Sequence, residues 1–253
     1  MKRVSSLRAI LTLALLVSCG TGAQRRTFPV EMAVQPMTGP NERGWTVTPE
    51  SIHVSVGTVR FYEGRVLLSS RWPRFEPYAL LGGTAWAHPG HYVPGDALGE
   101  VLKTTTVDLL AAQPSVLGEA NAVTGDYGSM ELTLSSATAA SDTQDLLRGH
   151  MVRIQGLATH SDGRRVRFDA EMNLPKPIEG IRFERTLEQE VGRVRITVEL
   201  ARWLGRIDFA TASPAGASGV STFPAESQAM NALVRGVEDT SAYVVTWVEG
   251  AAQ

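Results

Sequence analysis

The chain is poor in cysteine and in lysine. Cys19 is its single cysteine, and only three of its 24 basic residues are lysine. One cysteine excludes an intrachain disulfide and any Cys-x-x-Cys metal or redox site. The formal net charge of -2 provides no general attraction to nucleic acid. The sequence also lacks the G-x-S-x-G, H-E-x-x-H, P-loop and G-x-G-x-x-G motifs. We therefore predict a protein that is neither a nucleic-acid binder nor an enzyme.

The first residues have the pattern of a secretory signal peptide. Lys2, Arg3 and Arg8 accompany the apolar run Ala9–Val17. At about 1.5 Å per helical residue, a run of this length cannot cross a hydrocarbon core of about 30 Å. The pattern predicts a cleaved signal peptide over residues 1–18.

The four residues at the end of this segment, Leu16-Val17-Ser18-Cys19, resemble the bacterial lipobox. The resemblance implies cleavage before Cys19, attachment of diacylglycerol to its sulfur, and acylation of its amine by chains such as palmitate. Each buried CH₂ contributes about 0.8 kcal/mol, so several chains anchor a protein where one is marginal. Gly20 replaces the aspartate that marks inner-membrane retention in this family, which favours the outer membrane. The alternative is an ordinary signal peptide that happens to contain a cysteine.

The mature chain divides into two parts by composition. Residues 19–44 are rich in Thr, Gly, Pro, Gln and Arg without a sustained apolar period, which predicts a lipidated flexible tether. Residues 45–253 form the expected folded body, either undivided or split near residues 175–180. Removal of residues 1–18 takes away three basic residues and no acidic one, which changes the formal net charge from -2 to -5. An acidic body depends on its acyl chains for membrane attachment.

Apolar residues recur with period two along the body, as is typical of half-buried strands. The runs are Ile52–Phe61, Met130–Leu134, Val152–Ala158, Val166–Met172, Val194–Leu200 and Tyr243–Trp247. The apolar parity changes at Gly57-Thr58, which predicts a bulge within one long strand. The sequence His160-Ser161-Asp162-Gly163 predicts a hairpin turn. We expect an all-β fold, namely an antiparallel two-sheet β-sandwich.

The expected sandwich carries long loops and one short C-terminal helix. The loops are expected between Glu63 and Gly99. The helix is predicted after Pro224, where an apolar stripe has helical spacing. The stripe consists of Ala229, Met230, Leu233, Val234 and Val237.

A candidate metal site lies in the expected loops. His88 and His91 flank Pro89-Gly90, a turn that can bring both imidazoles to one side. Imidazole is the commonest metal ligand, and a His-dominated site suits copper or zinc. The candidate third ligands are Asp96, Glu100 and His53, and Trp86 and Tyr92 are aromatic residues that could shield the metal. The competing interpretation is a solvated turn without a metal.

Two stretches resemble known groups of proteins. The order Thr106–Leu110, Val116–Gly118 and Gly125–Leu134 is similar to uncharacterised bacterial envelope β-sandwich lipoproteins. The order Trp203, Ile207–Phe209, Ser227–Leu233 and Trp247 is similar to the methanobactin-associated periplasmic copper-binding proteins. Both resemblances imply an all-β envelope protein without enzymatic activity, and the second implies copper bound by histidines and an oxidised tryptophan.

Two functions follow from the sequence. In the first, a lipid-anchored envelope protein binds copper or zinc through its His-Pro-Gly-His loop and stores the metal or passes it to a partner. In the second, the loops bind another envelope protein or a glycan without a metal.

Overall fold

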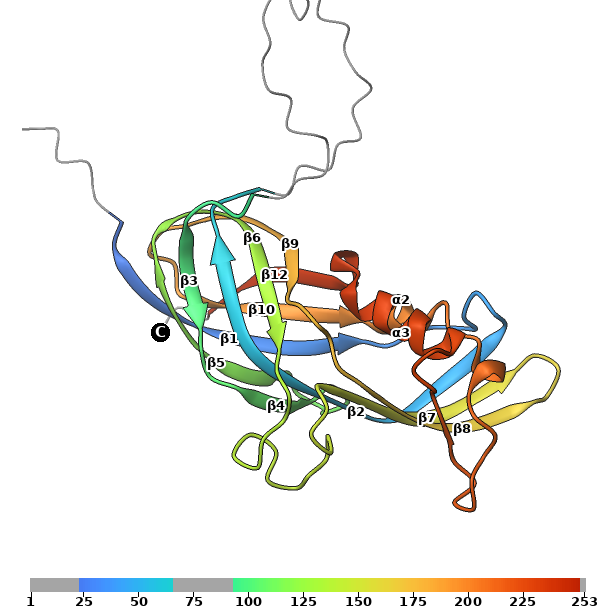
Figure 1. Ribbon diagram of the computed structural model, residues 1–253. Coiled ribbons are helices and arrows are strands. Elements are labelled where there is room, and N and C mark those ends of the chain that lie inside the picture. The colour runs from blue at the N-terminus through green and yellow to red at the C-terminus, as the bar shows by residue number, and fades with distance from the viewer. Residues whose placement is uncertain (1–22, 66–92, 251–253) are drawn as a thin grey trace, which may run out of the picture.

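The computed structural model describes residues 23–65 and 93–250 (Figure 1). The described strands and helices are β1 (Arg25–Gln35), β2 (Trp45–Tyr62), β3 (Ala97–Val101), β4 (Thr105–Asp108), β5 (Ser115–Val123), β6 (Gly125–Leu134), β7 (Val152–His160), β8 (Arg165–Met172), β9 (Ile178–Leu187), β10 (Gly192–Glu199), α2 (Leu200–Leu204), β11 (Ser221–Thr222), α3 (Gln228–Glu238) and β12 (Tyr243–Glu249). The all-β prediction is therefore confirmed. In this part of the chain, no helix is both long and apolar enough to cross a membrane.

The long strand β2 organises the sheet, because each of its edges pairs with two strands in succession. One edge pairs with β3 and β4. The other edge pairs with β6 along Val56–Tyr62 and then with β7 along Trp45–Val54. The chain segment between β6 and β7, residues 135–151, thus leaves and rejoins the same edge of β2.

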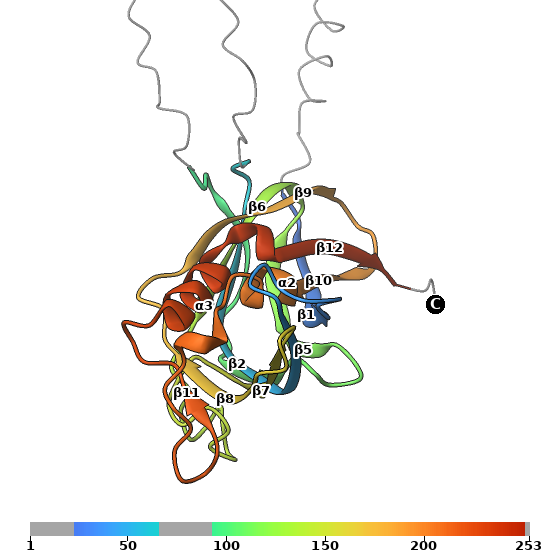
Figure 2. The same cartoon turned by 90° about the vertical axis from the view of Figure 1, so that its right-hand side faces the viewer.

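The sheet curls strongly around its core. From β2 it continues through β3, β5, β1 and β10 to β12, while β6 continues to β9, which comes into contact with β12. Figure 2 shows β6 and β9 on one side of the interior and β1, β5 and β2 on the other. Beyond this part, β7 and β8 extend the sheet, and β11 pairs with β8.

The sheet differs from the expected antiparallel sandwich in two ways. All the described strands belong to one hydrogen-bonded sheet of 12 strands, not to two separate sheets. The sheet is also mixed, because β1 runs parallel to β10 and β11 runs parallel to β8. Alternation within a strand reports which face is buried, and it does not report the direction of the neighbouring strand.

The predicted bulge in β2 is confirmed. The pairing register with β6 shifts between Val56 and Thr58, and both Val56 and Val59 are buried. A Cβ atom at Gly57 would lie 2.0 Å from Ser135 Oγ, so a larger residue here would displace that side chain. The extra residue lets one strand bury apolar side chains of both parities.

The core is one apolar cluster. It extends from Phe28 in β1 to Tyr243 in β12 and includes Leu174 and Ile181, on either side of the suggested division. Aromatic rings join the walls of the curled sheet: the Phe28 and Phe61 ring centroids are 5.6 Å apart, and those of Phe61 and Phe183 are also 5.6 Å apart. The described residues thus share one interior.

The predicted C-terminal helix is confirmed as α3. Ser227 caps it, since its side-chain oxygen accepts a hydrogen bond from the Met230 amide at 3.1 Å. Ala229, Leu233 and Val237 face the core and are fully buried. The helix packs on α2, and together they cover one end of the interior (Figure 2).

The expected flexible tether is wrong for residues 25–35, which form β1. Phe28, Val30 and Met32 are almost completely buried, and β1 lies between β5 and β10. Pro29 argues against a strand at the level of sequence, because proline has no backbone N–H to donate to a strand ladder. It is tolerated because the pairing with β10 begins only at Val30. Likewise, β3 occupies residues 97–101 within and beyond the expected loop region.

Candidate functional site

The central residues of the predicted metal site lie outside the described part of the chain. These residues are Trp86, His88, His91 and Tyr92, and the predicted lipidation residue Cys19 also lies outside it. The metal and lipidation hypotheses therefore stay predictions from the sequence.

The three remaining candidate ligands do not come together. Glu100 in β3 pairs with Arg60, with 3.6 Å between the carboxylate and guanidinium. His53 lies seven residues before Arg60 in the same strand, a separation of about 23 Å at about 3.3 Å per residue. Asp96 is exposed just before β3. Across residues 23–65 and 93–250, no group of three or more His, Cys, Asp or Glu residues is arranged to hold a metal. His53 cannot share a metal with Glu100.

The structure instead draws attention to the segment between β6 and β7, which we call the 135–151 loop. Its two ends meet on one residue: the Ser135 amide donates to the Ser55 carbonyl at 3.0 Å, and the Ser55 amide donates to the Met151 carbonyl at 2.8 Å. A compact excursion with adjoining ends is an Ω-loop, a type of segment that frequently carries function.

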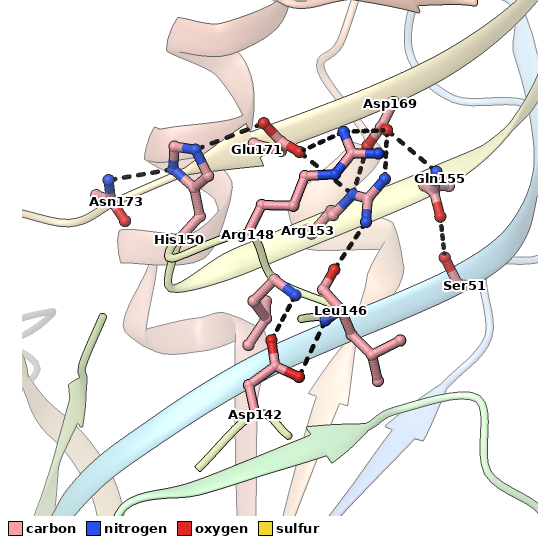
Figure 3. Close-up of polar contacts among 11 residues, drawn as sticks. Ser51, Asp142, Leu146, Arg148, His150, Arg153, Gln155, Asp169, Glu171 and Asn173 are labelled. Atoms are coloured by element: carbon pink, nitrogen blue, oxygen red, sulfur yellow. Dashed lines mark hydrogen bonds and ion pairs between the residues drawn. The ribbon is translucent and has the colours of Figure 1, made fainter. Parts of the chain in front are cut away.

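A buried ionic network lies beneath this loop (Figure 3). Arg153 of β7 is only 7% exposed. Its guanidinium forms a bidentate pair with Asp169 of β8, at 2.9 and 2.7 Å, and lies 3.3 Å from Glu171. The Arg153 Nη1 atom donates a hydrogen bond to the Leu146 carbonyl at 2.8 Å. Arg153 therefore ties the loop to the outer face of β7 and β8.

The loop also holds itself together. The Asp142 carboxylate is buried and accepts hydrogen bonds from the amides of Leu146, at 3.0 Å, and Leu147, at 2.7 Å. The Leu147 side chain is completely buried. In Figure 3, Leu146 lies between Asp142 and Arg153: its amide donates to Asp142 and its carbonyl accepts from Arg153. The loop is thus fixed from within by Asp142 and from below by Arg153.

Two residues of the loop have left-handed backbone conformations that are uncommon outside glycine. Asp145 has φ of 53° and Arg148 has φ of 50°. Such residues cost free energy, and they cluster at functional segments. Asp145 also lines a cavity of about 300 Å³ in the loop, together with Asp142.

The charges of the network are mutually satisfied. Asp169 contacts Arg153 and also Arg148, the latter at 3.6 Å. Glu171 contacts Arg148 at 3.1 Å and His150 Nε2 at 3.4 Å. Hydrogen bonds to Asp169 raise the pKa of Arg153 above its ordinary value. The network is therefore suited to hold a loop in place, and it presents no unpaired carboxylate for proton transfer.

Sequence reasoning did not find this site. Arg153 stands between Val152 and Ile154, at an outward position of a correctly predicted strand, where a charged residue is ordinary. The loop sequence is a run of small and polar residues. Only the pairing of β6 and β7 with one edge of β2 makes it a closed loop.

Comparisons with known proteins add no assignment: no family model, no curated protein and no solved structure matches the chain.

Proposed function

We propose that this chain is a lipid-anchored cell-envelope protein whose all-β body binds another envelope protein without catalysing a reaction. The lipobox-like residues that end in Cys19 support the anchor. The observation that carries the binding role is the 135–151 loop, held in one conformation by Arg153 and Asp142. The outer membrane is the proposed location, since Gly20 occupies the retention position.

A preformed loop is well suited to binding. Ordering a mobile segment during association costs free energy, and a segment already held in place avoids that cost. Loops positioned by a rigid scaffold are common recognition elements. The exposed residues of the loop, which include Ala139, Ala140, Thr143 and Gln144, are small or polar. They leave backbone amides and carbonyls within reach of a partner.

The chemistry of the loop favours a protein partner over a glycan. Residues 135–151 contain no Phe, Tyr or Trp, which are the side chains on which sugar rings stack. Asp145 is exposed and lines the cavity of the loop. The matching surface on the partner is therefore rich in hydrogen-bond donors and basic side chains.

Site-specific photo-crosslinking in intact bacterial cells tests this function. A photoreactive residue at Gln144 is compared with one at Thr246, an exposed position on β12. We expect one discrete protein adduct from Gln144 and none from Thr246. Equal adducts from both positions, or none from Gln144, would contradict the binding role of the loop.

The anchor is tested separately by labelled palmitate. The wild-type chain should incorporate the label and fractionate with membranes, and Cys19→Ala should do neither. A Cys19→Ala chain that retains the label would contradict lipidation at this residue.

A further inference from the structure

A second charged surface lies between α2 and α3, away from the 135–151 loop. A cavity of about 220 Å³ is lined there by Arg43, Arg202, Arg206 and Arg235 together with Glu42 and Asp239. We call this cavity the arginine groove. Its four arginines come from three segments: the turn before β2, α2 with the residues that follow it, and α3.

Close packing of the two helices produces the groove. Gly236 of α3 lies directly on α2, where a Cβ atom would be 2.7 Å from the carbonyl oxygens of Arg202 and Trp203. Arg202 and Arg206 are four residues apart, as are Asn231 and Arg235, so each pair shares one side of its segment. Both sides border the same cavity.

The groove carries more positive charge than its carboxylates balance. Arg202 pairs with Glu199 at 3.7 Å, and Arg206 pairs with Glu42 at 3.6 Å. These exposed pairs are weak and exchange readily for another anion. Among the described residues, Arg43 and Arg235 have no ion-pair partner. The Asp239 carboxylate already accepts hydrogen bonds from the Ser241 amide, at 2.9 Å, and from its hydroxyl, at 2.7 Å.

From this arrangement we infer that the arginine groove binds a phosphate group. Guanidinium groups form bidentate hydrogen bonds with phosphate oxygens. A tetrahedral phosphate offers oxygens toward several walls at once, whereas a carboxylate offers two oxygens in one plane. Donors from three segments therefore match a phosphate better.

The surroundings of the groove indicate a phosphomonoester with a small organic portion. A second cavity of about 300 Å³ adjoins the groove and shares Glu42, Ala201 and Arg202 with it. Its lining also includes Met37, Thr38 and Pro40, which are uncharged. The phosphate would occupy the arginine groove, and the uncharged remainder of the ligand would lie in the second cavity. A lipid headgroup and a soluble phosphate ester both have this chemistry.

Calorimetric titration of the full chain in mild detergent tests the inference. The probes are glycerol 3-phosphate, dihexanoyl phosphatidic acid and, as the zwitterionic control, dihexanoyl phosphatidylcholine. The test variant is Arg43→Gln/Arg235→Gln, which breaks no ion pair among the described residues. The control, Arg165→Gln/Arg182→Gln, removes the same charge from exposed positions in β8 and β9.

We expect binding of glycerol 3-phosphate, phosphatidic acid or both, with a dissociation constant at least about tenfold higher in the test variant, because that variant loses charge-assisted hydrogen bonds to the phosphate. The control variant should bind like the wild type. Arg43→Lys/Arg235→Lys, which keeps the charge and loses the planar fork, should bind with intermediate affinity.

The two phosphate probes distinguish the source of the ligand. Preference for phosphatidic acid identifies a lipid headgroup, and preference for glycerol 3-phosphate identifies a soluble ester. Absence of binding to both probes would overturn the inference. An equal loss in the control variant would also overturn it, because the effect would then reflect net charge alone. Neither result would bear on the 135–151 loop, which is a separate surface.

Discussion

Replacement of Arg153 by methionine tests the energetic role of the ionic network. Methionine retains much of the side-chain length and removes the guanidinium. Asp169, whose side chain is only 11% exposed, would then lose its bidentate partner, and the Leu146 carbonyl would lose a donor. Removing one partner of a buried pair costs about 3–5 kcal/mol because the other charge stays buried.

The expected cost lies near the lower end of that range. Asp169 keeps a hydrogen bond from Gln155 at 3.1 Å and its contact with Arg148. We therefore expect Arg153→Met to lower the free energy of unfolding by about 3 kcal/mol, which corresponds to about 6–12 °C in Tm for a chain of this size. Arg148→Met, at a side chain that is 57% exposed, should cost at most about 1 kcal/mol.

Urea unfolding followed by tryptophan fluorescence measures both values. The double variant Arg153→Met/Asp169→Leu removes both charges, and it should be more stable than Arg153→Met alone, because no unpaired charge stays buried. A loss below about 1 kcal/mol for Arg153→Met would refute the reasoning. A double variant less stable than the single variant would refute it equally.

Three further results are expected. Gly236→Ala should destabilise the chain by about 1–3 kcal/mol through overpacking against the carbonyls of α2, and it should weaken phosphate binding. Gly216→Ala, where no atom lies within 4 Å of the added Cβ, should change neither stability nor binding, as thermal unfolding and the calorimetric titration would show. Burial raises the pKa of Tyr127 to about 12 from 10.0. The stability that its neutral hydroxyl contributes is therefore complete below pH 10 and is lost as the pH rises through about 12. Urea unfolding between these pH values should show a smaller pH dependence for Tyr127→Phe than for the wild type, and an identical dependence would contradict this. Because His53 and Glu100 lie too far apart to ligate one metal ion together, at most one of His53→Ala and Glu100→Gln should lower the copper or zinc bound per chain; metal analysis of the full chain that shows a loss in both variants would contradict this.

Much of the sheet is predictable from alternation, because each strand buries one face. This signal identified β2 with its bulge, the β7–β8 hairpin and β12. It failed for β1, where Pro29 and the flanking polar residues imitate a linker. It also failed for β5, where Leu117 and Ala120 have opposite parity on either side of Gly118. The parallel pairing of β1 with β10 depends on contacts far apart in the chain, which local patterns do not report.

The proposed sites were less accessible to sequence reasoning than the fold. Histidine is readily proposed as a metal ligand from sequence because few residue types bind metals. His53 and Glu100, however, lie at distant positions on β2 and β3, which the sequence does not reveal. The importance of Arg153 and Arg235 comes from their neighbours in space. An arginine at an outward strand position or on an exposed helical side has the same local sequence pattern whether it faces solvent, a buried carboxylate or a cavity.

Hydrogen exchange in the 135–151 loop tests most directly the central claim that this loop is a preformed surface. The amides of Leu146 and Leu147 donate to Asp142, and they should exchange slowly in the wild-type chain. In Arg153→Met they should exchange faster, while the amide of Ile154 in β7 stays protected. Rapid exchange of Leu146 and Leu147 in the wild type, or unchanged protection in Arg153→Met, would contradict the account.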